Sequence, residues 1–155
     1  PSRTGISILP ETVARLSEIK NIVGIKEASG SIDQTTQILQ LCNITILSGD
    51  DSLTLPIMSV GGKGVISVVA NLVPSAVSEL TRYCLDGKYD AARKLHLKLF
   101  PLCKGMFIET NPIPVKTAMR LLGRLNGEMR LPLCEMTKEH EKQLKKVLKN
   151  YGLMS

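Results

Sequence analysis

The feature that most constrains this chain is an apolar run that ends in a lysine, an acid and a glycine turn, NIVGIKEASG at residues 21–30. The apolar residues before Lys26 predict a strand that is buried on both faces, which is typical of a parallel sheet covered by helices. Lys26 then falls at the C-terminal end of the strand. In α/β sheets and barrels, ligands bind at this end.

Lys26 is therefore a candidate nucleophile. An amine held in an apolar pocket is poorly solvated as an ammonium ion, which favours the neutral form that attacks a carbonyl carbon to give a Schiff base. The alternative is structural, with Lys26 paired to Glu27 or extended to solvent at the rim of the sheet. The local sequence leaves both interpretations open.

Composition excludes several classes of protein. Of the 155 residues, 43% are hydrophobic and 22% are charged, which is an ordinary globular composition. No uninterrupted apolar segment approaches the roughly 18 residues of a membrane span, and the N-terminus has no signal-peptide pattern. We therefore expect a cytoplasmic protein with no membrane partner. Because only 3% of the residues are aromatic and none is tryptophan, the core must be aliphatic.

The net charge of +6 raises the question of nucleic-acid binding. The positive excess is concentrated in the last expected helix, at Lys138, Lys142, Lys145, Lys146 and Lys149. No aromatic residues are interleaved there to stack on bases, and no nucleic-acid motif is present. A solvated helix face explains the lysines better, so we expect no nucleic-acid partner.

The polar motifs do not indicate a metal site. The four cysteines are scattered without the spacing of zinc ligands, so we expect reduced and mostly buried thiols. Asp50 and Asp51 resemble a metal pair or an acid/base pair, but an Asx turn that caps the next helix is the preferred interpretation. His96 and His140 lie on expected helices away from any strand end, which favours structural or exposed roles.

Helices and strands alternate through the first part of the chain. Pro10 begins a helix whose apolar stripe is Val13, Leu16 and Ile19. Ser31 is expected to cap a second helix, with Ile32, Thr35, Ile38, Leu39 and Cys42 on one face. Further elements are expected at residues 44–48 (strand), 52–60 (helix) and 65–69 (strand). Repeating β/α units predict parallel strands with right-handed crossovers.

Only helices are expected from Pro74 onward, over residues 74–85, 88–104, a segment ending at Gly123 and a last helix capped by Thr137. The expected domains are thus an α/β part at residues 1–72 and a helical part at residues 73–155. A closed (β/α)8 barrel takes about 250 residues, so this chain is expected to hold about half of one. It opens as if within a loop, which suggests a piece of a longer chain.

Five motifs carry a family resemblance: PSRTG at residues 1–5, GIKEA at 24–28, LSGDD at 47–51, GVISV at 64–68 and NPIPVK at 111–116. In this order they resemble the C-terminal half of the dihydrodipicolinate synthases, also called 4-hydroxy-tetrahydrodipicolinate synthases, over essentially the whole chain. The resemblance implies a pyruvate-dependent lyase of the class I aldolase type. It also implies the C-terminal half of a (β/α)8 TIM barrel followed by a C-terminal helical domain, in an enzyme that forms homotetramers or dimers.

The resemblance also assigns site residues. It makes Lys26 the catalytic lysine that forms a Schiff base with pyruvate, and Arg3 the residue that holds the carboxylate of L-aspartate 4-semialdehyde. Without the resemblance, Arg3 would be taken for an exposed loop arginine. Gly49 corresponds to a main-chain position close to the substrate, and Ile66 to a position whose backbone contacts pyruvate. The family implies no metal and no cofactor.

The reaction implied is the condensation of pyruvate with the semialdehyde to 4-hydroxy-tetrahydrodipicolinate, a step of lysine and diaminopimelate biosynthesis. The family's proton-relay residues, two tyrosines and a threonine, have no counterpart here, so we expect little activity from this chain alone. One alternative is another Schiff-base 2-keto-acid aldolase or lyase such as N-acetylneuraminate lyase, which shares the lysine but not the SRTG loop. A second is a non-catalytic half-barrel binding module.

Overall fold

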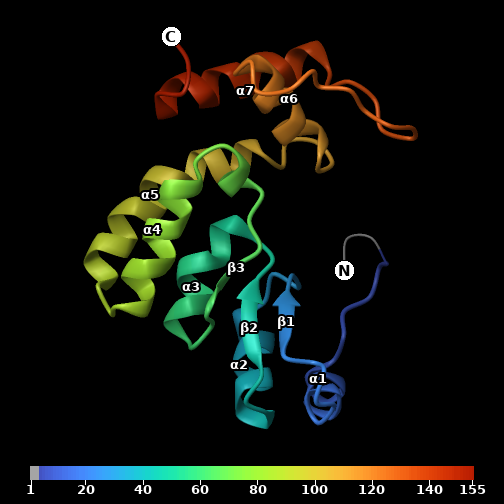
Figure 1. Ribbon diagram of the computed structural model, residues 1–155, viewed down its shortest axis with the longest axis vertical. Coiled ribbons are helices and arrows are strands. Elements are labelled where there is room, and N and C mark those ends of the chain that lie inside the picture. The colour runs from blue at the N-terminus through green and yellow to red at the C-terminus, as the bar shows by residue number, and fades with distance from the viewer. Residues whose placement is uncertain (1–3) are drawn as a thin grey trace. The chain divides into compact units, whose positions relative to one another are not determined.

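A computed structural model describes residues 4–155. Among them, the strands β1 (Gly24–Glu27), β2 (Thr45–Ser48) and β3 (Gly64–Val65) form a parallel sheet in the order β1-β2-β3. Figure 1 shows these strands with the helices that connect them. The predicted α/β class and the parallel pairing are confirmed.

The chain packs as two units. The first contains the residues up to Ser67 together with Thr81–Ala92, and the second contains Val68–Leu80 and Arg93–Ser155. The domain boundary that the sequence suggests, between residues 72 and 73, stays a prediction.

In the first unit, α1 (Pro10–Ser17) precedes β1, α2 (Ile32–Leu41) connects β1 to β2, and the 3-10 helix η1 (Asp51–Leu53) and α3 (Thr54–Ser59) connect β2 to β3. The local signals for these helices are those that the sequence predicts. Pro10 occupies the first turn of α1, where its missing N–H costs nothing. Ser31 caps α2, because its side chain accepts a hydrogen bond from the Gln34 N–H at 3.1 Å.

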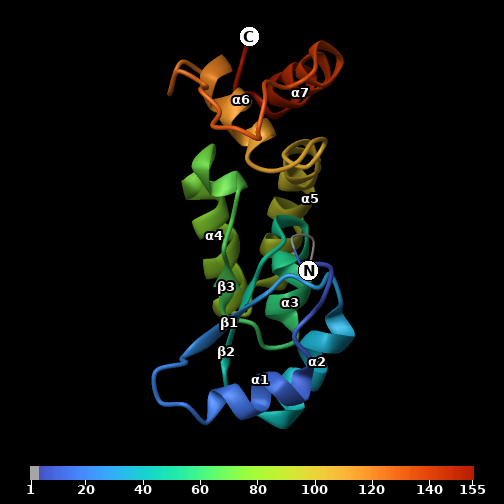
Figure 2. The same cartoon turned by 90° about the vertical axis from the view of Figure 1, so that its right-hand side faces the viewer.

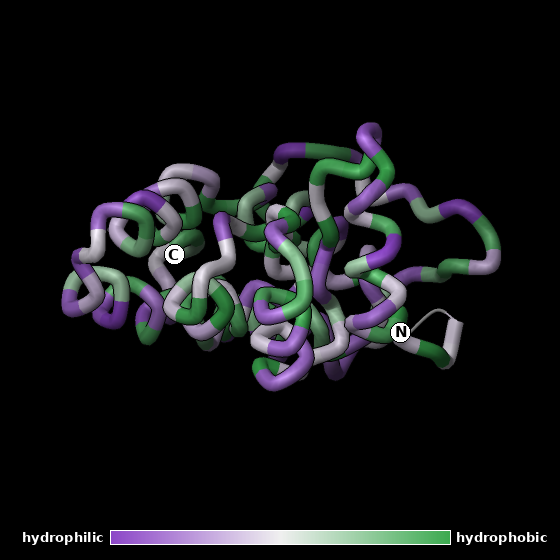
Figure 3. The backbone as a smooth tube through the Cα atoms, turned by 90° about the horizontal axis from the view of Figure 1, so that it is seen from below, coloured by the Kyte–Doolittle hydropathy of each residue, from purple (hydrophilic) through white to green (hydrophobic). Residues whose placement is uncertain are grey.

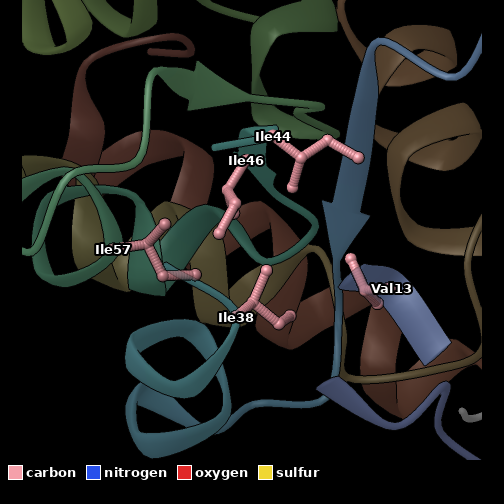
Figure 4. Packing of buried hydrophobic residues seen from close by; sticks show 5 residues of the cluster. All are labelled: Val13, Ile38, Ile44, Ile46 and Ile57. Carbon is pink, nitrogen blue, oxygen red and sulfur yellow. The ribbon is translucent and has the colours of Figure 1, made fainter. Parts of the chain in front are cut away.

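A cluster of aliphatic side chains joins the helices to the sheet: Val13 of α1, Ile38 of α2, Ile44 and Ile46 at β2, and Ile57 of α3. In Figure 4 the side chains of Ile38, Ile46 and Ile57 point toward one another. Each buried side chain of this size stabilises the fold by about 1.5–3 kcal/mol. The cluster lies on one face of the sheet, which we call the helix face.

Two expectations about burial are wrong. The run before Lys26 is not buried on both faces, because Val23 is 77% exposed and Gly24 and Lys26 are also exposed. In the described residues, helices cover only one face of the strand. Ile19 is exposed as well, since α1 ends before it.

The third strand is shorter than predicted. Residues 65–69 are rich in β-branched side chains, but β3 ends at Val65. Val68 adopts a right-handed helical conformation (φ −81°, ψ −43°), and the 3-10 helix η2 (Val69–Asn71) follows. The turn at Val68 therefore overrides the local preference for a strand.

The helices after residue 73 are α4 (Pro74–Leu85), α5 (Tyr89–Gly105), α6 (Ile113–Leu121) and α7 (Lys138–Tyr151), close to the predicted ranges. In the second unit, α6 packs against α7, and Figure 2 shows the two helices. Leu144 and Leu148 of α7 are fully buried. Thr137 caps α7 as predicted, by accepting a hydrogen bond from the His140 N–H. Gly105 permits a close approach, because a Cβ there would lie 3.0 Å from Val147 Cγ1.

Hydrophobic and hydrophilic segments alternate at short intervals along the chain (Figure 3). Over residues 4–155, no helix is long and apolar enough to cross a membrane. The four cysteines are free. Cys84 and Cys103 are buried as predicted, and burial raises the pKa of the Cys84 thiol, whereas Cys134 is exposed.

Glu109 connects the segment between α5 and α6 to the start of α7. Its Oε1 accepts hydrogen bonds from the Thr137 N–H (3.0 Å) and hydroxyl (3.1 Å) and lies 2.7 Å from His140 Nδ1. Burial raises the pKa of Glu109, but the hydrogen bonds from His140 and Thr137 and the charge of His140 outweigh it. The net result is a pKa below the ordinary value of 4.5.

This arrangement predicts a pH-dependent contribution to stability. Because the pKa of Glu109 is lower in the folded chain than in the unfolded chain, the stabilisation is complete above pH 4.5 and is lost as the pH falls through the folded value. We expect Glu109→Gln to lower the thermal unfolding midpoint at neutral pH, with a difference that shrinks below pH 4.5. Calorimetry across this pH range measures it.

Glu135, an exposed residue of the connector before α7, supplies the control. Glu135→Gln removes the same charge and should leave the midpoint nearly unchanged throughout the range. A midpoint difference for Glu109→Gln that stays constant with pH would contradict the assignment.

Candidate active site

Three of the residues singled out from the sequence lie at one end of the sheet. Lys26 is in β1, where it pairs with Leu47 of β2, and Leu47 in turn pairs with Gly64 of β3. Gly49 directly follows β2 and Ile66 directly follows β3. Because the strands are parallel, all three residues belong to the C-terminal edge of the sheet, the edge at which α/β proteins bind ligands.

The same residues share one face of the sheet. A Cβ on Gly49 would lie 3.0 Å from Lys26 Cε, and one on Gly64 would lie 3.4 Å from Leu47 Cδ2, so these four residues are on the same side. Ile66 comes two residues after Gly64 and faces the same way, since strand side chains alternate. We call this side, opposite the isoleucine cluster, the open face. Lys26 is exposed on it.

Main-chain hydrogen bonds continue the sheet beyond the last residues of β2 and β3. The Gly49 N–H donates to the Glu27 carbonyl at 2.6 Å, and the Ile66 N–H donates to the Ser48 carbonyl at 2.8 Å. The backbone at Gly49 and Ile66 is thus tied to the neighbouring strand at the level just beyond Lys26. Gly49 has no side chain to cover the stem of Lys26, and this leaves the lysine accessible from that direction.

Glu27 has a role that the local sequence did not predict. Its carboxylate is buried on the helix face, where it accepts hydrogen bonds from the Ser29 N–H (2.6 Å) and from Gln34 Nε2 (3.1 Å). It thereby ties the turn after β1 to α2. The ion pair between Lys26 and Glu27, which the sequence left open, is not formed in the described residues, because adjacent strand residues point to opposite faces.

The two aspartates after Gly49 have different environments. Asp50 forms the predicted Asx turn, because its Oδ1 accepts from the N–H and the hydroxyl of Ser52, both at 2.8 Å. Asp51 is buried and accepts a hydrogen bond from the Ser67 hydroxyl. Within residues 4–155, no group of three or more His, Cys, Asp or Glu side chains could hold a metal ion.

Other candidate residues lie elsewhere. Arg3 is outside the described residues. His96 is on α5, where its ring contacts Phe100 and burial lowers its pKa, and His140 belongs to the Glu109 contact in the second unit. Neither histidine follows a strand, as the sequence indicates.

A family profile, that of the dihydrodipicolinate synthetase family, matches residues 1–151. The chain belongs to this family. It is 55% identical to the 4-hydroxy-tetrahydrodipicolinate synthase of Methanocaldococcus jannaschii and 52% identical to that of Geobacter sulfurreducens, over 99% of its length in each case. The predicted family resemblance is confirmed.

Solved structures agree with the sequence comparison. The dihydrodipicolinate synthase of Aquifex aeolicus superposes with a TM-score of 0.96 at 48% identity, over 99% of this chain and 53% of that one. A monomeric dihydrodipicolinate synthase variant superposes with a TM-score of 0.94 at 42% identity, over 99% and 53%. The chain spans about half the length of the curated relatives it matches, 54% of the M. jannaschii protein.

The close packing around Gly49 yields a testable prediction. A Cβ at residue 49 would meet Ala28 Cβ at 2.6 Å and the Glu27 carbonyl oxygen at 3.0 Å. We expect Gly49→Ala to destabilise the chain by about 1–3 kcal/mol through overpacking, measured by denaturant unfolding. Adding Ala28→Gly removes the closest clash and should recover part of the loss.

Gly64→Ala is the matched control, because the added methyl group would make only ordinary contact with the flexible end of Leu47. Equal stability losses for Gly49→Ala and Gly64→Ala would show that the tight packing beside Lys26 is not a constraint on the fold.

Proposed function

We propose that this chain is the C-terminal half of a Schiff-base lyase that condenses pyruvate with L-aspartate 4-semialdehyde to give 4-hydroxy-tetrahydrodipicolinate. The observation that carries the proposal is the position of Lys26, which is exposed on the open face near the C-terminal end of a parallel strand, beside a glycine that leaves its stem uncovered. Family membership and the names of the relatives support the substrates.

The proposed architecture is half of a (β/α)8 barrel followed by a helical domain. A barrel strand has one face toward the surrounding helices and one toward the barrel interior. The helix face and the open face of this sheet suit those two roles. In this proposal the open face with Lys26 is turned to the interior, and the strands of the other half pair with the free edges of β1 and β3.

Lys26 begins the proposed reaction. Its neutral amine attacks the ketone carbon of pyruvate, and loss of water gives an imine that tautomerises to an enamine. The enamine carbon adds to the aldehyde of the second substrate. Attack by the amine of that substrate on the imine carbon then closes the ring and releases the lysine. The proton transfers belong to two tyrosines and a threonine of the family that have no counterpart in this chain.

The other site residues bind rather than react. The Ile66 backbone contacts pyruvate, and the absence of a side chain at Gly49 leaves room for the bound keto acid. Arg3 holds the carboxylate of the semialdehyde through a bidentate pair. The complete enzyme is proposed to act in the cytoplasm as a homo-oligomer, a tetramer or a dimer, without a metal, cofactor or nucleic acid.

The first test traps the Schiff base. We expect a chimera, in which this chain replaces the matching half of the M. jannaschii relative, to give a borohydride-reduced pyruvate adduct confined to Lys26, located by peptide mass spectrometry. The chain alone should give little or none, because it supplies only one side of the site. The adduct should vanish in Lys26→Arg, which keeps the positive charge but not the nucleophile.

Lys63 provides the matched control. It is an exposed lysine that directly precedes β3, so it lies at the opposite end of a strand from the proposed site. Lys63→Arg should leave the adduct unchanged. A correctly folded chimera without an adduct, or with adducts spread over several lysines, would refute the catalytic assignment and favour the half-barrel binding module.

Arg3 separates the synthase from other Schiff-base aldolases. We expect Arg3→Ala in the chimera to raise the KM for L-aspartate 4-semialdehyde by about tenfold to a hundredfold, the loss of a charge-assisted pair. The KM for pyruvate should change less than about threefold, measured in steady-state kinetics with each substrate varied. Equal effects on both substrates would instead favour a lyase with a different acceptor, such as one of the N-acetylneuraminate lyase type.

A further inference from the structure

A buried polar network lies behind the C-terminal edge of the sheet. Ser48 is fully buried at the end of β2, where its hydroxyl donates to the Asp50 carbonyl at 2.7 Å and accepts from the Asp50 N–H at 3.2 Å. Asp51 is only 5% exposed, and its Oδ1 accepts from the Ser67 hydroxyl. The hydroxyl of the buried Thr54 donates to the Asp51 carbonyl at 2.9 Å.

The contact between Asp51 and Ser67 joins the two loops that carry the site. Asp51 comes two residues after Gly49, and Ser67 directly follows Ile66. The Ser67 hydroxyl is turned toward the buried carboxylate of Asp51 rather than toward the open face. The contact thus holds the two loops from the helix face, where it does not occupy space needed by a ligand on the open face.

The sheet ladder reaches Ile66 just beyond β3. The strand β3 has two residues, the chain turns at Val68, and the Ile66 N–H donates to the Ser48 carbonyl. A hydrogen bond to a buried carboxylate is roughly twice as strong as one between neutral groups.

We infer that Asp51 and Ser67 are positioning residues, which hold the backbone at Ile66 against the loop after Gly49 so that it meets the keto acid bound at Lys26. This inference deepens the proposed function and rests on it. Neither residue touches the reacting atoms. Their effect is on how well the site binds pyruvate before chemistry, rather than on the chemical steps that follow.

The test compares the two substrates in the chimera described above. We expect Ser67→Ala to raise the KM for pyruvate about tenfold, the loss of one hydrogen bond to a charged group, while kcat and the KM for the semialdehyde change less than about threefold. Ser67→Thr keeps the hydroxyl and should restore the wild-type KM. Asp51→Asn keeps an acceptor oxygen without the charge and should give an intermediate KM.

Ser52→Ala is the matched control. The Ser52 hydroxyl also bonds to an aspartate of the same loop, Asp50, but it does not reach the segment after β3. It should leave the KM for pyruvate unchanged. If Ser52→Ala and Ser67→Ala raise this KM equally, or if Ser67→Thr fails to restore it in a folded protein, the positioning role is refuted.

A second measurement separates this inference from the proposed function. Failure of the wild-type chimera to trap pyruvate at Lys26 would refute the proposed function itself. Hydrogen exchange of the Ile66 amide then tests the contact independently, because its N–H bonds to the Ser48 carbonyl. We expect about tenfold faster exchange in Ser67→Ala and no change in Ser52→Ala. Unchanged exchange in Ser67→Ala would overturn the inference.

Discussion

The packing of isoleucine side chains between the helices and one face of the sheet determines which way Lys26 and its neighbours in the sheet point. Ile46 and Ile38 are almost fully buried in this cluster, which fixes which side chains of β2 face the helices. The parallel register then determines which side chains of β1 and β3 share that face. A slip of one residue would move the core residues to the other side of the sheet. Lys26 lies on the open face because its neighbour Ile25 packs against the cluster.

Much of the fold follows from short-range signals that a single sequence contains. The caps at Ser31 and Thr137 involve contacts within one helical turn, and the buried stripe of α2 repeats with the helical period. Where burial depends on other segments, the sequence was a poorer guide. The apolar run before Lys26 predicts burial on both faces, yet only the helix face is covered in the described residues, and Val23 is exposed. Similarly, β-branched residues predict a longer third strand than the turn at Val68 allows.

In the site, too, the residues that belong to short sequence motifs could be predicted, and those whose contacts depend on other segments could not. Lys26 and Gly49 could be singled out because each belongs to a short motif beside a predicted strand end. The roles of Glu27 and Ser67 could not, because each depends on which face of the sheet the side chain occupies and on what approaches it there. Asp51 and Ser67 are separated by α3 and β3 in sequence, and only the parallel pairing of β2 with β3 brings them together. The predicted Asx turn is therefore correct for Asp50, whereas it does not predict the contact that Asp51 makes with Ser67.

The composition of the open face bears on what it can bind. Gly24, Thr45, Gly49 and Gly64 are small, and a Cβ on Gly24 would meet Thr45, which places both on this side. Leu47 and Ile66, which is 45% exposed, are the larger aliphatic side chains on this face, and the remaining positions around Lys26 are small. The same small residues leave space around the Lys26 amine and main-chain groups within reach. Such a surface is consistent with the proposed barrel, in which the strands of the other half enclose this face and the proposed keto acid reaches Lys26 beside Gly49.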